Sequence, residues 1–426
     1  MVRFLSATFL LLTCQVIDAR QDRTVDGQAE QSMGGIALPQ PQDFVTTRGK
    51  EIVAPDGKPL LLRGINLGNW LVPEGYMFRF DSATSPRTIN DVICEMVGAD
   101  EAAKFWKKYH DSYITREDIH FIKTLGLNSV RVPFNWRLFV VEGQPDVWAG
   151  PGFELLDRVI GWCKEAGLYV ILDMHCAPGG QTGDNIDDSW GYPFLFENPE
   201  SQDRTIQLWR KIAERYRDET IVIGYDLLNE PIPHFYDQKK FNPLLEPLYK
   251  RIVAGIREVD SNHIVFLGGA QWDTNFGVFG PPFDSRLAYT FHKYWCDTTQ
   301  AMIDEYVTFR QKYDVPLWMG ESGENKDAWI GGWRRLQERN NIGWCFWPYK
   351  KMDSPRCLVT FDRPHNWALL SRFSGQSRQS FASLRAHRPS VDSVKKALDE
   401  FVTLSQFKNC RLNEGYADAL GIGKKK

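Results

Sequence analysis

The chain repeats one pattern of hydrophobic and polar positions eight times between residues 61 and 347. Each repeat has a short apolar run, then a polar loop, and most then have a stretch with apolar residues at helical spacing. Short apolar runs rich in β-branched residues are typical of strands buried on both faces, as in a parallel sheet. The eight strands are predicted at residues 61–66, 129–134, 169–175, 221–229, 263–268, 287–292, 315–320 and 342–347.

Helices are predicted between these strands and near the end of the chain. The clearest helical patterns lie at residues 116–125, 153–166, 203–217, 243–259 and 390–405. Gly126 and Gly167 follow two of them and are typical helix C-caps. The alternation indicates the α/β class, and eight units predict a closed (β/α)8, or TIM, barrel. An open doubly wound sheet is the alternative, but no Gly-rich phosphate loop follows the first strand.

The region before the first repeat predicts three further parts. Residues 1–19 combine one positive charge with a short apolar run, which is typical of a secretory signal peptide and too short for a membrane span. Residues 20–42 are polar and are predicted to be a flexible linker. Residues 44–62 predict a small β-hairpin with an Asp-Gly turn at residues 56–57, and this hairpin is expected to cap the bottom of the barrel.

These assignments place the main domain at residues 43–410 and a C-terminal tail at residues 411–426. We expect an exported protein, either secreted or held in the periplasm or at the cell surface. Residues 11–14 weakly resemble a bacterial lipoprotein box, so lipid anchoring at Cys14 stays open as an alternative. No later stretch is long and apolar enough to predict a membrane span.

Composition excludes some partners and favours others. The net charge of −3 gives no reason to expect nucleic acid or an anionic membrane as a partner. The 15 Trp residues are unusual, and an aromatic face beside a polar strand end can stack on a sugar ring. Seven cysteines follow Cys14, an odd number without a Cys-x-x-Cys spacing, so at least one does not pair within the chain and a zinc site is not expected.

Two of the predicted strands end in a carboxylate. Asn229 and Glu230 follow one apolar run, which stops at Pro231, and Glu321 ends another. Loss of water at a buried strand end raises the pKa of a carboxyl group, as a general acid requires. The two glutamates are 91 residues apart, about three βα units of roughly 30 residues each. We therefore expect them to face each other across the barrel mouth, the arrangement that glycoside cleavage uses.

Polar or aromatic residues also mark the ends of most other predicted strands, where such barrels place their chemistry. Taken singly, each has an ordinary explanation: a histidine is more often a core residue, and a tryptophan is equally often one. A buried arginine between two valines needs a carboxylate partner. The coincidence on successive strands favours a site. Its members besides Asn229 and the two glutamates are Asn66, Trp70, Arg131, Asp173, His175, His292, Tyr294 and Trp347.

Eight of these residues, in order along the chain, resemble the active site of glycoside hydrolase family 5, the retaining β-glycanases and β-glucosidases. They are Arg131, His175, Asn229, Glu230, His292, Tyr294, Glu321 and Trp347. Asn229-Glu230-Pro231 matches the acid/base motif of the family and Gly320-Glu321 its nucleophile, and the resemblance covers about residues 44–347. Residues 62–74 and 175–183 resemble the exo-β-1,3-glucanase branch. Cys176 stands where that branch usually has glycine, and residues 184–190, 291–296 and 344–350 also depart from its pattern.

The resemblance implies a double-displacement mechanism that needs no metal or organic cofactor. Glu321 is expected to attack the sugar and Glu230 to act as acid and then base. Arg131 and Tyr294 are expected to hold Glu321, Asn229 to bind the sugar 2-hydroxyl, and His175 and His292 to position the substrate and support Glu230.

The expected substrate is a β-1,3- or β-1,4-glucan or a β-linked oligosaccharide, acted on by a monomer. Two alternatives stay open. One is a β-mannanase or glycolipid-cleaving β-glycosidase on the same scaffold. The other is a non-catalytic carbohydrate-binding barrel, which is expected to lack a catalytic carboxylate.

Overall fold

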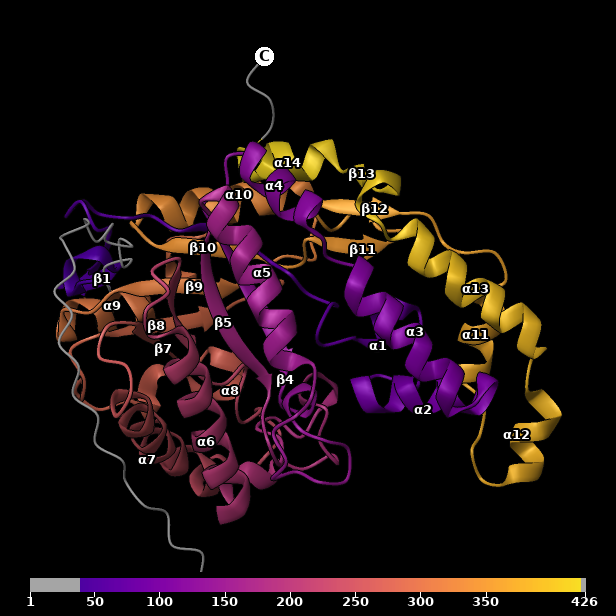
Figure 1. Cartoon of the computed structure of the whole chain (residues 1–426). Helices are drawn as coiled ribbons and strands as arrows, with labels where there is room; N and C mark the ends of the chain where they lie inside the picture. The colour runs from indigo at the N-terminus through magenta and orange to yellow at the C-terminus, as the bar shows by residue number, and fades with distance from the viewer. Residues whose placement is uncertain (1–38, 423–426) are drawn as a thin grey trace, which may run out of the picture. The chain divides into compact units, whose positions relative to one another are not determined.

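Eight parallel strands close into a barrel in the computed structural model, which describes residues 39–422 (Figure 1). The strands pair in the order β10-β3-β4-β5-β6-β7-β8-β9. Their bounds are β3 (Arg63–Asn66), β4 (Ser129–Asn135), β5 (Tyr169–Cys176), β6 (Val222–Asp226), β7 (Ile264–Gly268), β8 (Leu287–His292), β9 (Leu317–Glu321) and β10 (Gly343–Phe346). The predicted barrel and its eight strands are thus confirmed, whereas the predicted signal peptide and residues 20–38 of the predicted linker lie outside the described residues.

One strand is shorter than predicted. The apolar run 221–229 continues past the end of β6, which stops at Asp226. Glu230 and Ile232 have φ values of +50° and +54°, so the chain turns sharply instead of continuing the ladder. The prediction that Asn229 belongs to the strand is wrong, because this left-handed turn and not the apolar pattern determines where the chain leaves the sheet.

Helices cover the outside of the barrel. Those between barrel strands are α4 (Arg116–Thr124), α5 (Gly152–Ala166), α6 (Pro199–Tyr216), α7 (Gln238–Arg257), α9 (Asp304–Tyr313) and α10 (Asp327–Arg339), with the short α1 (Gly75–Phe78) and α8 (Ala270–Asp273) in loops. Their apolar faces and the outer faces of the strands form the main core. Among the described residues, no helix is long and apolar enough to cross a membrane.

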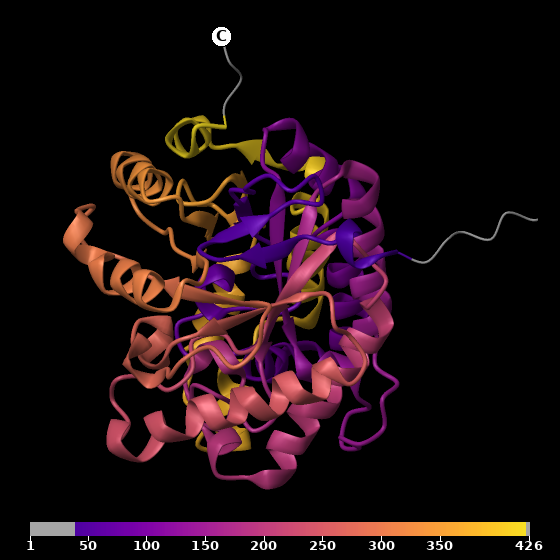
Figure 2. The same cartoon turned by 90° about the vertical axis from the view of Figure 1, so that its left-hand side faces the viewer.

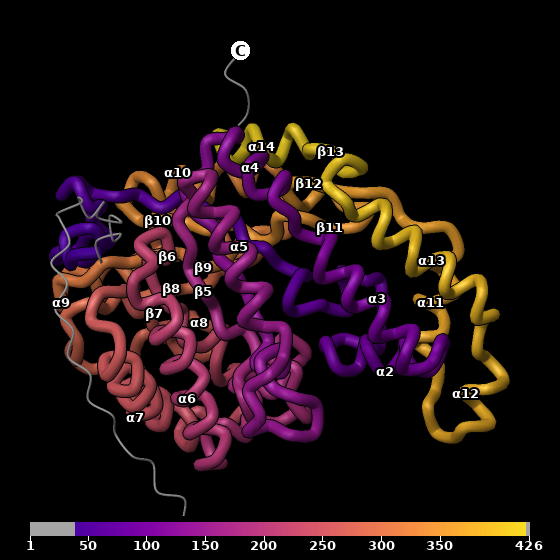
Figure 3. Tube along the Cα trace, in the orientation of Figure 1, coloured from indigo at the N-terminus to yellow at the C-terminus, as the bar shows by residue number. Residues whose placement is uncertain are grey.

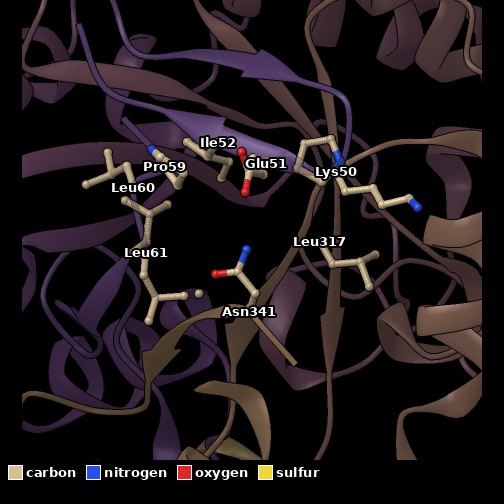
Figure 4. Close-up of a pocket in the computed structure, with 11 residues that line it drawn as sticks. Lys50, Glu51, Ile52, Pro59, Leu60, Leu61, Leu317 and Asn341 are labelled. Carbon is tan, nitrogen blue, oxygen red and sulfur yellow. The ribbon is translucent and has the colours of Figure 1, made fainter. Parts of the chain in front are cut away.

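The N-terminal hairpin closes the bottom of the barrel. Strands β1 (Thr46–Arg48) and β2 (Glu51–Val53) pair antiparallel, and in Figure 2 they lie across the end of the barrel that faces the viewer. Ile52 of β2 and Leu317 at the start of β9 line the same small cavity (Figure 4). Inside the barrel, Ile52 packs in one cluster with Trp318. The predicted cap is therefore confirmed.

The predicted Asp-Gly turn is present. Gly57 N–H donates to the Ala54 carbonyl oxygen at 2.9 Å, and beyond the turn Pro59 pairs antiparallel with Val53. A second turn at Gly49, with φ +55°, joins β1 to β2.

A second helical layer lies to one side of the barrel and was not predicted as a unit. In Figures 1 and 3 the early helices run beside the late ones, and α13 packs against both α2 and α3. Its helices are α2 (Pro86–Val97), α3 (Ala99–Ser112), α11 (Trp367–Ser374), α12 (Phe381–His387) and α13 (Val391–Leu404). Phe401 is buried at its centre and stacks on Phe78 and Trp367. The sequence pattern predicted only α13 among these helices.

The last described residues also pack into the fold. A small sheet contains β11 (Lys350–Met352), β12 (Val359–Phe361) and β13 (Arg411–Leu412), and α14 (Glu414–Leu420) packs against α10. Tyr416 of α14 is buried, and its hydroxyl donates to the carbonyl oxygen of Trp347 at 3.2 Å. Part of the segment predicted as a tail thus contacts the backbone of a predicted site residue.

Candidate active site

A cavity of about 540 Å³ opens at the C-terminal ends of the barrel strands. That volume is within the usual range of about 300–1,000 Å³ for small-molecule sites. Its walls come from loops that follow at least five different strands. The lining residues include Glu74, Tyr76, His175, Asp184, Glu230, Trp272, His292, Tyr294, Trp295, Glu321, Glu324 and Trp347.

Glu321 at the end of β9 is held by two donors. One guanidinium nitrogen of Arg131 lies 2.9 Å from Oε2, and the Tyr294 hydroxyl donates to Oε1 at 2.7 Å. Burial raises the pKa of the Glu321 carboxyl, while the Arg131 charge and the Tyr294 hydrogen bond oppose that rise. A charge-assisted pair of this geometry stabilises the ionised carboxylate.

Arg131 connects Glu321 to the floor of the site. Its guanidinium is fully buried and also contacts Asp226 at 2.9 Å and Asp173 at 3.1 Å. Burial opposes the charge, but the surrounding carboxylates raise the pKa of Arg131 above its usual value. The predicted buried arginine with a carboxylate partner is thus confirmed.

Two asparagines complete the contacts of Arg131. Asn66 and Asn229 each accept a hydrogen bond from it, at 3.1 and 2.9 Å. These contacts fix the plane of the guanidinium and its aim at Glu321. The Asn229 Nδ2 atom makes no hydrogen bond within residues 39–422.

Glu230 has a different environment. His292 Nδ1 lies 3.0 Å from Oε1, and no cation contacts this carboxyl within the described residues. Its backbone is anchored on both sides: its N–H donates to Asp273 Oδ2 at 3.1 Å, and its carbonyl oxygen accepts from the Thr182 hydroxyl at 2.9 Å. Burial first, and then the charge of Glu321, raise the pKa of Glu230 well above its usual value.

The two glutamates approach each other closely. One oxygen of Glu230 and one of Glu321 lie within 4.8 Å. Retaining glycosidases hold their carboxyl groups about 5–5.5 Å apart, whereas inverting ones leave about 6.5–9.5 Å for a water molecule. An oxygen-to-oxygen separation of at most 4.8 Å is compatible with the retaining spacing. Because Arg131 and Tyr294 contact Glu321 directly and do not contact Glu230, the first proton lost by the pair leaves Glu321 and Glu230 keeps its own.

The same carboxylates and His292 form a group whose spacing could suit a metal ion. One ligand atom from each of the three residues lies within 4.8 Å of the others. The Arg131 guanidinium, 2.9 Å from Glu321, already neutralises that carboxylate and would repel a cation. The electrostatics of this group therefore favour an acid/base pair and do not fit a metal centre.

His175 and Trp347 form another wall. Their rings stack with centroids 5.6 Å apart, and His175 Nδ1 lies 2.7 Å from Asp173 Oδ2. Trp347 Nε1 donates to the Tyr76 hydroxyl at 2.8 Å. Burial lowers the pKa of His175 to about 3, so the ring is neutral. The result is a rigid aromatic surface with oriented polar edges, suited to a sugar ring.

Most of the predicted site residues meet at this cavity, but not all in the same way. Six of them line it: His175, Glu230, His292, Tyr294, Glu321 and Trp347. Asn66, Arg131, Asp173 and Asn229 are not part of the cavity lining. Arg131 contacts Glu321, and the other three residues contact Arg131. Trp70 does not lie in the cavity wall: its indole is fully buried and its Nε1 donates to the His110 carbonyl oxygen at 3.0 Å.

Several residues of the site were not predicted because they lie in loops beyond the strand ends. Glu74, Tyr76 and Glu324 line the cavity, and Lys351 contacts Glu324 at 2.8 Å. Burial and the nearby glutamates raise the pKa of Glu74. Glu74 closes the motif 62–74 that resembled the glucanase branch. That motif was the only signal in the sequence that could have identified it.

Comparisons with known proteins agree with this geometry. Residues 93–353 match the family model Cellulase (glycosyl hydrolase family 5). A β-xylosidase of Phanerodontia chrysosporium is 30% identical over 344 residues, which cover 72% of this chain and 71% of that protein. A probable glucan 1,3-β-glucosidase A of Aspergillus fumigatus is 31% identical over 212 residues, 49% of each chain.

Similarity to solved structures supports the barrel fold. The crystal structure of an endogalactoceramidase matches with a TM-score of 0.58 at 19% identity, over 88% of this chain and 84% of that one. The family model spans more than half of the chain, and the xylosidase shares 30% identity over more than two thirds of it. The chain therefore belongs to glycoside hydrolase family 5.

Proposed function

We propose that this chain is a retaining β-glycosidase that acts on β-glucans, with Glu321 as the nucleophile and Glu230 as the acid/base. Membership of the family makes it a glycoside hydrolase acting on β-glucans or related glycans. The finer assignment depends on the different surroundings of the two closely spaced carboxyl groups. Arg131 and Tyr294 hold Glu321, whereas the buried imidazole of His292 contacts Glu230.

In the first step, a Glu321 oxygen attacks the anomeric carbon and the bond to the leaving oxygen breaks. Glu230 transfers its proton to that oxygen, so the leaving group departs as an alcohol and Glu230 becomes a carboxylate. Arg131 and Tyr294 orient the attacking carboxylate. The product is an ester between the sugar and Glu321.

In the second step, the Glu230 carboxylate accepts a proton from water, and the oxygen of that water attacks the anomeric carbon. The ester bond breaks, and Glu321 leaves as a carboxylate. Two inversions at one carbon give net retention of the β-configuration. The Asn229 Nδ2 group, which makes no hydrogen bond within the described residues, is proposed to donate to the sugar 2-hydroxyl.

Three observations support a β-glucan as the substrate. The motif 62–74 places Glu74 at the cavity, relatives include proteins named glucan 1,3-β-glucosidase and endoglucanase, and aromatic rings surround the cavity mouth. A β-xylosidase among the relatives makes xylosides the natural comparison.

The experiment measures hydrolysis of aryl β-glucosides and β-xylosides, laminarin, cellulose, mannan and xylan, and follows the first product by proton NMR. We expect the highest kcat/KM on glucosides and β-glucan, with a β-anomer as the first product. An α-anomer as first product contradicts the double displacement, and a clear preference for mannan or xylan contradicts the substrate assignment.

We also propose that the chain is exported, secreted or held at the cell surface, on the basis of the apolar run within residues 1–19. Expression of the full chain with fractionation and N-terminal sequencing tests this. We expect a mature extracytoplasmic form that begins near residue 20. Labelling with palmitate would instead indicate anchoring at Cys14, and an unprocessed cytoplasmic protein would contradict export.

A further inference from the structure

Asp273 lies directly behind the acid/base pair. It ends α8, in the loop after β7, and its side chain is fully buried. Oδ2 accepts the N–H of Glu230 at 3.1 Å and lies 3.4 Å from Nε2 of His292. Oδ1 makes no hydrogen bond to any of residues 39–422. A buried carboxyl group with an unpaired oxygen is costly, so its presence calls for an explanation.

The backbone around Asp273 is shaped to accommodate this carboxyl group. Gln271, Trp272 and Asp273 have φ values of +52°, +58° and +60°, a left-handed run that residues other than glycine rarely adopt. A Cβ atom on Gly268 would lie 1.9 Å from Asp273 Oδ1, so only glycine at the end of β7 leaves room for the group. Both the loop and the strand end therefore direct Asp273 toward Glu230 and His292.

We propose that Asp273 is a positioning residue that sets the tautomer of His292 and thereby keeps Glu230 protonated before attack. This inference rests on the proposed acid/base role of Glu230. His292 Nε2 makes no hydrogen bond to any of residues 39–422, and the carboxyl oxygen Oδ2 of Asp273 lies 3.4 Å from it, so a favourable contact between the two atoms requires a proton on Nε2. The Nδ1 atom of the neutral ring is then an acceptor, and at 3.0 Å it accepts the Glu230 O–H.

The surrounding charges are compatible with a neutral ring. Burial, and after it the Arg131 charge and the neighbouring His175 imidazole, lower the pKa of His292 well below its usual value. The groups that face Asp273 and Glu230 include the carboxylates of Asp226, Glu74 and Glu321 and the phenols of Tyr249 and Tyr306. The 3.4 Å contact is longer than a good hydrogen bond, but catalytic contacts commonly shorten when substrate binds.

Asp273→Asn tests the proposal with little change in shape. Asparagine tolerates positive φ and keeps an oxygen for the Glu230 N–H, but it cannot carry the negative charge by which an ionised Asp273 attracts a proton to Nε2. Burial, and after it the charges of Asp226 and Glu230, oppose that ionisation and raise the pKa of Asp273 well above its usual value. The Nδ1–H tautomer then becomes accessible and donates to the Glu230 carboxylate, which favours the deprotonated acid. We expect the alkaline limb of the kcat/KM profile to move to lower pH by about one unit or more.

The leaving group separates this role from a structural one. The comparison is made at pH values between the alkaline limb of Asp273→Asn and that of the wild-type enzyme. There the variant is expected to lower kcat/KM at least about tenfold for a substrate with a poor leaving group, and much less for an aryl glycoside with an activated leaving group. Asp284→Asn, which removes a half-buried carboxylate paired with Arg257, is the matched control and should leave the profile unchanged. Equal slowing of all substrates with the limb at its wild-type pH overturns the proposal.

Two further measurements keep the proposal testable if Asp273→Asn folds poorly. Gly268→Ala displaces the carboxyl group without removing it and should shift the limb in the same direction.

Nitrogen-15 NMR of histidine-labelled wild-type enzyme, with His292 assigned by its loss in His292→Gln, should show a protonated Nε2 and a bare Nδ1. A protonated Nδ1 below the alkaline limb overturns the tautomer assignment. If Glu230→Ala shows no dependence on the leaving group, the acid/base assignment itself has failed.

Discussion

At the scale of single residues, two chemically identical carboxyl groups differ through their neighbours. Arg131 and Tyr294 contact Glu321, whereas within residues 39–422 the Glu230 side chain makes its hydrogen bond to the neutral imidazole of His292 and to no other group. In a buried site a nearby cation lowers the pKa of a carboxyl group, and burial without one raises it. The same environments that assign the roles of nucleophile and acid also predict how the enzyme responds to mutation and pH.

Replacing Glu321 by Gln should remove nearly all hydrolysis. The amide cannot form the glycosyl ester, and loss of a nucleophile usually costs several orders of magnitude in kcat. Steady-state kinetics on an activated aryl glucoside measure this, with the melting temperature as a check of folding. Glu305→Gln, at an exposed position on α9, serves as the control. Turnover near the wild-type rate in Glu321→Gln would exclude it as the nucleophile.

Replacing Glu230 by Ala should affect substrates according to their leaving groups. A poor leaving group needs the proton of Glu230 and should react far more slowly, whereas an activated aryl group should leave readily in the first step. Added azide should then replace the water that Glu230 no longer activates and yield a β-glycosyl azide. Product analysis by mass spectrometry and NMR tests this. Uniform slowing without azide rescue would count against the assignment.

The pH profile of kcat/KM should be bell-shaped. The nucleophile must be ionised, so activity is lost as pH falls through the lower pKa, which belongs mainly to Glu321. The acid must be protonated, so activity is lost as pH rises through the higher pKa, which burial and Glu321 raise at Glu230. Both values belong to the coupled pair. An alkaline limb that persists unchanged in Glu230→Ala would show that another group supplies it.

At the scale of elements, the loops after β6, β7 and β8 bring aromatic rings to the cavity mouth. Trp272 and Trp295 line the cavity, and Phe235 contacts Trp272 with ring centroids 6.0 Å apart. Phe235 and Trp295 are 55% and 73% exposed, which is unusual for large apolar side chains. Phe235 follows Glu230 by five residues, so its contact with Trp272 places it in the same group of loops as the proposed acid. We therefore infer that these rings contact the leaving-group part of the substrate.

Phe235→Ala and Trp295→Ala should raise KM for a β-glucan oligosaccharide about two- to tenfold each, since a ring contact contributes about 0.5–1.5 kcal/mol. The kcat on an aryl glucoside should change little, because the catalytic carboxylates are untouched. Phe381→Ala, an exposed phenylalanine at the start of α12, is the matched control. Equal KM values for the oligosaccharide in all three variants would remove the rings from the substrate path.

At the scale of the described chain, a buried ion pair joins the barrel to the lateral helices. Lys350 of β11 lies 2.8 Å from Asp118 of α4, with both side chains fully buried. The Lys350 ammonium also donates to the carbonyl oxygen of Ser405, at the end of α13. One residue thus connects segments that are distant in sequence, and its loss leaves a charge without its partner.

Lys350→Met should lower the free energy of unfolding by about 3–5 kcal/mol, the usual cost of stranding a buried charge. Denaturant titration at neutral pH measures it. Lys107→Met breaks an exposed pair with Asp111 on α3 and should cost about 0–1 kcal/mol. If the two variants lose the same free energy, the buried pair does not have the role assigned to it.

The sequence by itself determined the barrel and the two glutamates that face each other at its mouth. Apolar periodicity is a local property and can be found in the sequence alone. Because parallel strands bring their C-terminal ends together, the residues at those ends, such as the ones that follow Val130 and Met319, must meet at the same end of the barrel. Glu230, Glu321, Arg131 and Tyr294 could be predicted on that basis. Their family motifs then supplied the roles.

Only the tertiary structure decided the rest, because it depends on contacts between segments far apart in the chain. The left-handed turn at Glu230 is anchored by Asp273 and Thr182, from two other loops. Trp70 follows a strand end, yet its side chain lies in the core, where its indole N–H donates a hydrogen bond to the carbonyl oxygen of His110 in α3. Periodicity cannot encode such pairings: a loop side chain points where long-range packing and hydrogen bonding direct it, whereas a strand residue points where the pleat directs it.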